Sequence, residues 1–403
     1  MLPRVKINFA NGALGSVVPS PDCVAGLIAT AETVADTFVL GNAYMLHKTD
    51  DLASLGITAS NNACLYKHVQ EFYDEAGDGA ELWIMGVPNT IKPSEIADKD
   101  NALVPYAKNL IQIANGRLRF LGIAYEPASG YEATIEEGLD SDVWAAALKA
   151  QALAEWATTQ LFAPLFVILA GRGFNNTNIT ALKDLTTLNY NRVGILIGDT
   201  KSESEGAAVG LLMGRIAQSP VQRHIGRVRD GALKVLKAYI GDKDPSLANV
   251  EAIHDKGYIT LRCFTGKSGY FFSDDCLATA VADDYRSIAR RRTVDKAYRI
   301  VYATMLEHVN DELPITDKGY LVPSQTKAWE SEIISAIANQ MTSNGELGTD
   351  SGNADDKGVK VYIDPEQCVV ATSKVNVVVQ VKPYGYAKFI DVELGFITIN
   401  SED

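Results

Sequence analysis

The chain has 403 residues, of which 47% are hydrophobic and 22% are charged. These shares are ordinary for folded proteins and exclude collagen-like and intrinsically disordered chains, and the length predicts two or three domains of about 100–200 residues. The formal net charge of -13 disfavours nucleic acid and anionic membranes as partners, unless the basic residues are gathered in one place.

No apolar stretch is long enough to cross a membrane. The longest, 163–170, contains Pro164 and falls far short of the roughly 20 residues that a spanning helix needs. The first residues lack the basic and then apolar layout of a secretion signal, so we expect the chain to stay in the cytosol. Five scattered cysteines without a CxxC pair predict reduced thiols, with neither disulfides nor a zinc cluster; they are Cys23, Cys64, Cys263, Cys276 and Cys368.

An extended arm is expected at the N-terminus, over residues 1–20. Val5, Ile7 and Phe9 alternate there with polar residues, ahead of a run rich in Gly and Pro. From 21 to 240, strand-like runs alternate with helix-like runs, which is the βαβ rhythm of an α/β domain with a largely buried sheet. Strands are expected over 24–30, 81–87, 117–125, 165–170 and 192–198, and helices over 62–76, 101–115 and 141–159.

A second unit is expected over 245–383, after the turn-rich residues 241–246. Helices are expected over 247–256, 283–309 and 326–342, and strands over 258–264, 269–274, 359–371 and 374–382, with a polar loop over 344–358. The chain is therefore predicted to be α/β in its first domain and α+β overall.

A C-terminal β arm is expected over residues 384–403, with a strand over 387–399. Its apolar residues are Phe389, Ile390, Val392, Leu394, Ile397 and Ile399. A strand at the end of a chain, reached here through Pro383 and Gly385, pairs either within its own sheet or with the sheet of another subunit. The pattern alone leaves both alternatives open.

One glycine-containing turn is similar to a nucleotide-binding loop. Gly171-Arg172-Gly173 follows the strand over 165–170, as in the dinucleotide-binding turn, where glycines let backbone amides approach a pyrophosphate. Asn175 and Asn176 stand where the third glycine should fall, and the sequence has no P-loop, so a plain turn at the end of a strand is favoured. The alternative hypothesis is a cytosolic α/β enzyme or nucleotide-binding protein with a site near 165–215.

The remaining candidate motifs indicate structure rather than chemistry. Gly206, Gly210 and Gly214 recur every four residues in an apolar run, which favours close packing of a helix. The histidines form no i, i+4 pair and no HExxH cluster; they are His47, His68, His224, His254 and His308. Neighbouring acids at 136–137, 274–275 and 283–284 are interpreted as solvated turns. We therefore predict no catalytic, cofactor-binding or metal-binding residues and no cofactor.

A basic segment lies within the helix expected over 283–309. It contains Arg286, Arg290, Arg291, Arg292, Lys296 and Arg299. At about 100° per residue, an apolar stripe from Val294 to Val309 lies opposite Arg292, Lys296 and Arg299. We expect these three side chains to form an exposed cationic ridge, which is either solvated or a docking site for an acidic protein or a neighbouring copy.

The succession of segments over 245–400 carries a family resemblance. Asp255-Lys256-Gly257-Tyr258 ends a helix before a strand and a short aromatic hairpin, and a long helix then contains Tyr285-Arg286-Ser287-Ile288, Arg291-Arg292 and Asp295-Lys296. A later helix with Trp329 and a closing pair of strands follow. This order and spacing resembles the C-terminal region of the tail sheath proteins of contractile bacteriophages and related injection systems, whereas the first half is similar in layout only.

The resemblance implies a structural, non-enzymatic subunit without a cofactor. It implies an outer α/β domain over 21–240 and an inner sheath-like α+β domain over 245–383, with extended N- and C-terminal β arms. In one alternative, the first strands of the outer domain belong to the inner domain instead. Sheath subunits stack as hexameric rings into a helical sleeve around a tail tube, and the sleeve contracts to drive the tube through a target envelope. Assembly in the bacterial cytoplasm and a final place in a virion tail or injection particle are implied too.

The resemblance also assigns partners. They are other copies of this chain, the tail tube protein, and baseplate and tail terminator proteins, with no nucleic acid and no membrane span. Terminal arms would complete the sheets of neighbouring subunits, through Val5, Ile7 and Phe9 at one end and the apolar residues from Phe389 to Ile399 at the other. Arg292, Lys296 and Arg299 would contact the tube or an adjacent subunit.

Overall fold

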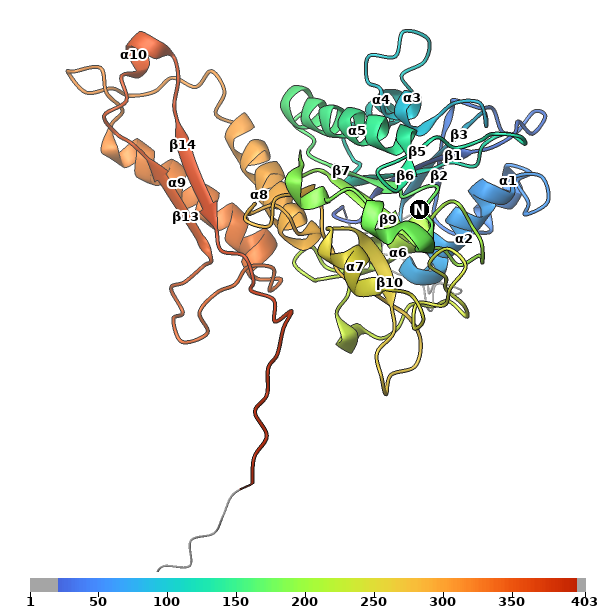
Figure 1. Ribbon diagram of the computed structural model, residues 1–403. Coiled ribbons are helices and arrows are strands. Elements are labelled where there is room, and N and C mark those ends of the chain that lie inside the picture. Colours follow the sequence, from blue (N-terminus) through green and yellow to red (C-terminus); the bar gives the residue numbers. More distant parts are fainter. Residues whose placement is uncertain (1–20, 397–403) are drawn as a thin grey trace, which may run out of the picture.

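The computed structural model describes residues 21–396 (Figure 1). The expectations for Val5, Ile7, Phe9, Ile397 and Ile399 therefore lie outside the described residues. The described chain forms a large α/β lobe and a smaller lobe, which are joined by a long helix. Beyond the smaller lobe, the end of the described chain runs away from both lobes as a single extended segment (Figure 1).

An eight-stranded sheet forms the centre of the large lobe, in the order β11-β10-β9-β7-β4-β1-β3-β2. Its central strands run parallel; they are β1 (Ala25–Thr30), β3 (Leu82–Val87), β4 (Phe120–Ala124), β7 (Phe166–Ala170), β9 (Val193–Ile197) and β10 (Ile259–Arg262). The edge strands β2 (Ala43–Leu46) and β11 (Phe271–Phe272) are antiparallel to their neighbours. The predicted α/β class is confirmed, because these short, mostly apolar runs are buried on both faces of a parallel sheet.

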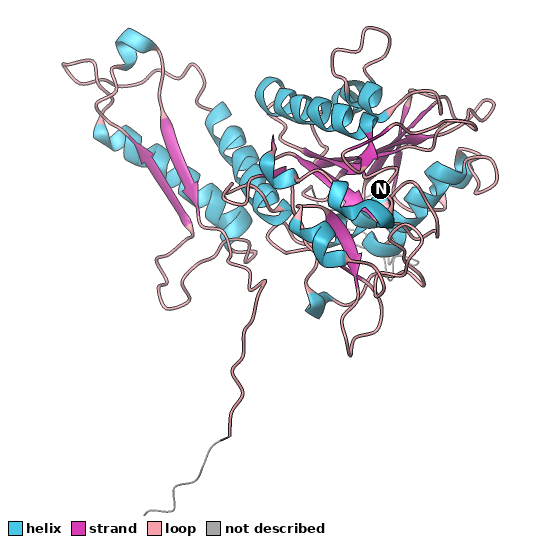
Figure 2. Ribbon diagram, viewed as in Figure 1, coloured by secondary structure: helices cyan, strands magenta, loops and turns pink. Residues whose placement is uncertain are grey.

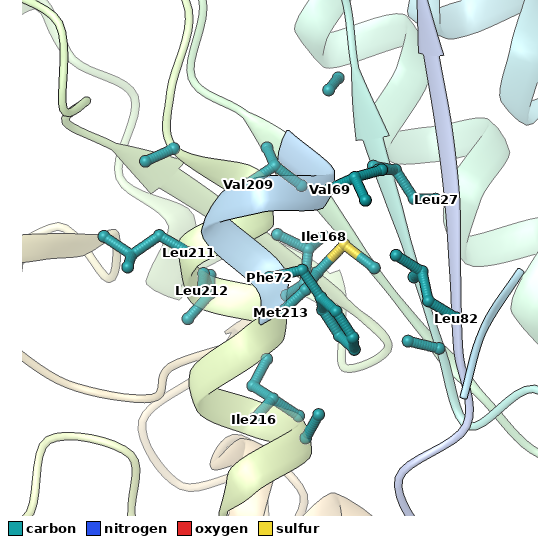
Figure 3. Close-up of a cluster of buried hydrophobic side chains, with 14 of the residues drawn as sticks. Leu27, Val69, Phe72, Leu82, Ile168, Val209, Leu211, Leu212, Met213 and Ile216 are labelled. Atoms are coloured by element: carbon teal, nitrogen blue, oxygen red, sulfur yellow. The ribbon is translucent and has the colours of Figure 1, made fainter. Parts of the chain in front are cut away.

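Helices cover both faces of this sheet (Figure 2). On one face lie α2 (Ala63–Ala76) and α6 (Val209–Gln218), and on the other α3 (Pro93–Ala97), α4 (Tyr106–Ile113) and α5 (Ser141–Gln160). Figure 3 shows the first face, where Phe72 of α2 and Met213 of α6 meet Ile168 of the sheet. The Asp140 side chain accepts a hydrogen bond from the Asp142 amide and so caps α5. Two separate cores therefore stabilise the sheet from its two sides.

Shorter elements complete the large lobe. They are α1 (Asp51–Ser54), β5 (Ile135–Glu136), β6 (Leu139–Asp140), β8 (Asn189–Tyr190), α7 (Val250–Asp255), β12 (Ala278–Thr279) and the 3₁₀ turns Asn176–Ala181, Leu185–Thr187 and Val228–Asp230. The five cysteines are free thiols, as predicted. No helix among residues 21–396 is long and apolar enough to span a membrane.

Two glycines of α6 let α2 and α6 approach closely. The four-residue spacing of Gly206, Gly210 and Gly214 predicts such packing, and the structure shows it at Gly210 and Gly214. A Cβ atom at Gly210 would collide with the backbone of His68 in α2, and one at Gly214 would lie 2.5 Å from the carbonyl oxygen of Phe72. Gly206 precedes α6 and meets nothing nearer than Ser204 Oγ at 3.6 Å. Helix packing thus accounts for Gly210 and Gly214.

Gly210→Ala is expected to destabilise the protein by about 1–3 kcal/mol, because overpacking against a backbone outweighs the gain of about 1 kcal/mol in helix propensity. The matched control Gly206→Ala meets only Ser204 Oγ, at an ordinary van der Waals distance, and is expected to change the unfolding free energy by less than about 0.5 kcal/mol. Urea unfolding of the two variants measures the difference. Equal stabilities would contradict the packing argument.

The boundary between the two lobes lies later in the chain than expected. We predicted a second unit from residue 245, yet β10 pairs with β9 and β11 pairs with β10, so these strands belong to the large sheet. The turn-rich residues 241–246 close a loop within the large lobe, and turn residues do not distinguish such a loop from a linker between domains. The smaller lobe follows the long helix α8 (Ile288–Leu306).

The smaller lobe packs one helix on a two-stranded sheet. It contains α9 (Pro323–Ile337), a π turn (Ala338–Thr342), β13 (Val359–Ile363), α10 (Val369–Thr372) and β14 (Val377–Val381). Alternate residues of β14 face a small core around Ile333 and Ile337 of α9, as the valine pattern predicts. β13 and β14 pair antiparallel with Val361 opposite Val379. The expected strand over 359–371 ends at Ile363, and its last three residues lie in α10.

Candidate assembly surface

Large apolar side chains are exposed along the C-terminal end of the described chain. Residues 389–396 have no strand pairing with the rest of residues 21–396. Their large apolar side chains are between 77% and 103% exposed; these are Phe389, Ile390, Val392, Leu394 and Phe396. A run of exposed apolar residues is typical of an interaction site. The described part of the arm does not adopt the alternative in which this strand pairs within its own chain.

Two side chains hold the root of this segment on the large lobe. Tyr386 Oη donates a hydrogen bond of 2.7 Å to the carbonyl oxygen of Gln222. Lys388 Nζ donates to both carboxylate oxygens of Asp274, at 2.6 and 2.8 Å. Because Asp274 is buried, these charge-assisted bonds are stronger than the same pair would be in water. They fix the place from which the arm departs.

A cluster of ionisable groups surrounds this contact. Burial alone would lower the pKa of His224, but the carboxylates of Asp275 and Asp274 raise it to about 9, with its Nε2 at 2.8 Å from Asp274 Oδ1 and 3.2 Å from Asp275 Oδ1. Burial would raise the pKa of Asp274, and His224 and Lys388 hold it well below its usual range instead. The interpretation of 274–275 as a solvated turn is wrong, since both acids are buried and paired.

The spacing of His224, Asp274 and Asp275 is one that a metal ion can use, since ligand atoms of all three lie within 4.8 Å of one another. Two contacts account for the cluster without a metal ion. The Lys388 ammonium already supplies positive charge to Asp274, and the Gly226 amide donates to Nδ1 of His224 at 3.0 Å. Nε2 of His224 faces both carboxylates, so the proton on this nitrogen points at Asp274 and Asp275. The arrangement is an ion network that holds the arm.

The sheet of β13 and β14 offers a complementary surface. Both of its outer edges lack a strand partner among the described residues. Tyr362 and Val378, a pair across the two strands, are 56% and 53% exposed on the face away from α9. Unpaired edges of a short sheet are ready templates for a strand from another chain.

The expected exposed cationic ridge is wrong. Arg292 and Lys296 are only 4% and 8% exposed, because α8 runs between the two lobes instead of along the surface. Lys296 Nζ lies 2.6 Å from Asp22 Oδ2 and 2.7 Å from Glu346 Oε2, and Arg299 lies 2.7 Å from Asp22 Oδ1. Lys296 and Arg299 are thus paired with acids of their own chain, and the contact with the tube or an adjacent subunit that was assigned to Arg292, Lys296 and Arg299 stays a prediction.

The face of α8 that we expected in a core is partly open to solvent. Of this stripe, Val301 and Met305 pack against the core of the smaller lobe, whereas Val309, just beyond α8, is 62% exposed. Beside the stripe, the ring of Tyr302 stacks on Phe162 with centroids 4.8 Å apart. Helical periodicity finds the two stripes of this helix correctly but assumes that the basic one is exposed. The acids that neutralise the other stripe come from positions far away in the sequence.

A buried ion network joins α8 to the large sheet. Arg192, just before β9, donates from both terminal nitrogens to Asp295 of α8, at 3.0 and 3.2 Å, and Arg291 donates to the same carboxylate at 2.9 Å. All three side chains are buried. The pattern of charges along α8 identified the basic residues but not their partner Arg192.

Protein contacts occupy the glycine-containing turn after β7. The amide of Gly171 donates to the carbonyl of Leu196 at 2.7 Å, and that of Gly173 to the carbonyl of Glu205 at 2.9 Å. Arg172 is buried over the rings of Tyr125 and Tyr131. Because these amides already have acceptors, the turn does not present the free donors that a pyrophosphate needs. The predicted plain turn is confirmed, and the alternative site near 165–215 loses its strongest motif.

Two family models together match nearly the whole chain. The model described as "DUF2586, N-terminal domain" matches residues 2–276, and "DUF2586, C-terminal domain" matches residues 284–401. The chain belongs to the DUF2586 family. The gap between the two matched ranges falls between the eight-stranded sheet and α8, where the structure divides into its lobes. A search of curated proteins by sequence finds no match.

Solved structures share this DUF2586 fold over almost its full length. A chain of the anti-feeding prophage baseplate has a TM-score of 0.63 at 14% identity, covering 99% of each chain. A chain of the contracted PVC sheath, from an extracellular contractile injection system, has a TM-score of 0.60 at 14% identity, covering 98% of this chain and 97% of that one. A sheath tail protein from Desulfitobacterium hafniense has a TM-score of 0.51 at 11% identity, covering 90% and 94%. The sheath-like fold that the resemblance implied is confirmed.

Proposed function

We propose that this DUF2586 protein is the structural subunit of a contractile sheath. Subunits polymerise as stacked hexameric rings around a tail tube, and the sleeve contracts to drive the tube through a target envelope. The observation that carries the proposal is the exposed apolar arm at residues 389–396, on a chain whose fold matches sheath structures over its full length.

Strand addition between subunits is the proposed mode of assembly. The C-terminal segment of one subunit adds to an open edge of β13–β14 in a neighbour, and backbone hydrogen bonds set the register. Burying one large apolar side chain contributes about 1.5–3 kcal/mol, so the five exposed side chains of residues 389–396 are enough to hold subunits together. The N-terminal arm, through Val5, Ile7 and Phe9, is proposed to pair in the same way.

Contraction then needs no cofactor and no bond-breaking chemistry. The energy is stored as a difference between two packings of one lattice, and the arms keep neighbours connected while the globular lobes move. The proposed partners are other copies of this chain, the tube protein, the baseplate and the tail terminator. Assembly is proposed to take place in the bacterial cytoplasm, before the sleeve becomes part of a virion tail or an injection particle.

Deleting residues 1–12 tests the role of the N-terminal arm. The shortened chain is expected to remain a folded monomer with an unchanged midpoint of thermal unfolding and to lose polymerisation on tubes. Sedimentation and circular dichroism measure the two effects separately. A large loss of stability would show instead that these residues form an internal strand, and normal polymerisation would remove the arm from the proposal.

A further inference from the structure

The start of the described chain is held as firmly as the root of the C-terminal arm. Arg119 Nε donates to the carbonyl oxygen of Pro21 at 2.7 Å, and the Asp22 carboxylate pairs with Lys296 and Arg299 of α8. Burial would raise the pKa of Asp22, but Lys296 and Arg299 lower it, so the carboxylate stays charged at neutral pH. Residues 21–22 therefore form a fixed root for the N-terminal segment.

One short loop, Ser219–Gln222, lies between the two roots. The Arg292 guanidinium donates to the carbonyl oxygen of Ser219 at 3.0 Å and to that of Asp22 at 3.4 Å, so it joins the loop to the N-terminal root. At the other end of the loop, the carbonyl oxygen of Gln222 accepts from Tyr386 of the C-terminal root. The two roots are thus separated by only this loop and one side chain at each of its ends.

A second set of contacts also connects the loop to the N-terminal root. The Gln222 side chain donates to the carbonyl oxygen of Gly345 at 3.0 Å, and the next residue, Glu346, pairs with Lys296, which also holds Asp22. A cavity of about 290 Å³ borders the loop and is lined by Asp22, Cys23, Ser219, Pro220, Val221 and Glu346. The loop is therefore tied at both ends but not fully packed along one side, which gives it room to shift.

We propose that Ser219–Gln222 couples the two terminal segments, so that loosening one root loosens the other. Displacing Tyr386 removes a bond that holds Gln222, and the resulting shift weakens the contact of Arg292 with Ser219 and Asp22. In a sleeve of connected subunits, tension on a C-terminal arm would then weaken the contacts that hold the root of the N-terminal arm in the same subunit. All of the contacts lie within one chain, so the coupling goes beyond the proposed sheath function and is testable without assembly.

Alkylation of Cys23 reports the state of the N-terminal root, because this thiol lines the cavity beside the loop. In the full chain, Tyr386→Phe with Lys388→Ala removes all three side-chain hydrogen bonds of the C-terminal root. We expect the rate of Cys23 alkylation by iodoacetamide, followed by peptide mass spectrometry, to rise at least about five-fold, the lower end of measured couplings between sites. The thiol of Cys368, in the smaller lobe, serves as an internal reference.

The control is Lys382→Ala, which removes an ion pair with Asp356 in the smaller lobe and contacts neither the loop nor a root. It should leave the Cys23 rate unchanged. Tyr386→Phe alone keeps the ring beside His224, 5.7 Å between centroids, and is a milder variant if the double one folds poorly. An unchanged Cys23 rate in folded root variants would overturn the coupling.

Coupling is reciprocal, so the reverse experiment must agree. Asp22→Asn weakens the N-terminal root, and acylation of Lys388 by a lysine-reactive ester then reports the C-terminal root, because the Lys388 ammonium is bound by both carboxylate oxygens of Asp274. The acylation rate of Lys388 is expected to rise by a similar factor, relative to the exposed Lys327. An effect in one direction only, or effects confined to the altered root, would contradict the proposal.

Discussion

Deletion of residues 389–403 is expected to abolish polymerisation and to leave the subunit folded. The described part of this segment, 389–396, buries almost none of its apolar surface within its own chain, so its loss removes nothing from either core. The unfolding free energy should change by less than about 0.5 kcal/mol, as for other changes at exposed positions. Assembly should fail because the strand that adds to β13–β14 of a neighbour is gone. Thermal unfolding and sedimentation velocity measure the two outcomes on the same sample.

Point variants test whether assembly needs the apolar side chains of the arm or only the presence of the arm. Val392→Asp with Leu394→Asp places charges where the strand would bury apolar side chains and should prevent assembly as the deletion does. The interleaved pair Asp391→Asn with Glu393→Gln changes the alternate positions and should leave assembly in place. Normal polymerisation of the deleted chain, or a loss of stability above about 2 kcal/mol, would contradict the role of the arm.

Asp295→Ala is expected to be the most destabilising single substitution that we predict. It leaves Arg192 and Arg291 buried without their shared carboxylate, and breaking such a buried pair costs about 3–5 kcal/mol. Because the network joins β9 to α8, the loss should also loosen the smaller lobe. Urea unfolding followed by circular dichroism, with hydrogen exchange of α8, measures both effects.

Two control variants test whether the cost of Asp295→Ala comes from buried charges that are left unpaired. Asp100→Ala removes an exposed ion pair with Lys99 and should cost no more than about 1 kcal/mol. Replacing Arg192, Arg291 and Asp295 together with apolar residues of similar size should recover part of the loss, because no buried charge is then left unpaired. A cost for Asp295→Ala close to that of Asp100→Ala would show that water reaches the network.

The parallel sheet was predictable because its strands are short apolar runs between turn residues. The run over 165–170, for example, becomes β7 almost residue for residue. The cap of α5 is a local feature of the same kind, because the Asp140 side chain accepts from the Asp142 amide two residues on. Such signals are local, so they survive without knowledge of the three-dimensional contacts.

Contacts between distant parts of the chain were not predictable. Lys296 is buried because Asp22 and Glu346 neutralise it, and neither acid is near it in the sequence. The ion network at the root of the arm joins Asp274 to Lys388 for the same reason. Helical periodicity alone therefore did not reveal that the basic face of α8 is buried as well, and turn residues alone placed the domain boundary too early.

These errors change how the charges of the chain are understood. The basic helix does not form an exposed patch on an acidic protein. Much of its positive charge is neutralised in the interior by Asp22, Glu346 and neighbouring groups. The exposed features that remain for assembly are the apolar arm and the open edges of β13–β14. Subunit association should therefore be less sensitive to salt than a cationic ridge would make it.

Cryo-electron microscopy of the concentrated full-length chain tests the proposed function most directly. We predict stacked rings or tubes in which residues 389–396 of one subunit lie as an added strand beside β13 or β14 of a neighbour. Discrete monomers or dimers at every concentration and in the presence of tubes, or a lattice in which the arm folds back on its own subunit, would contradict it.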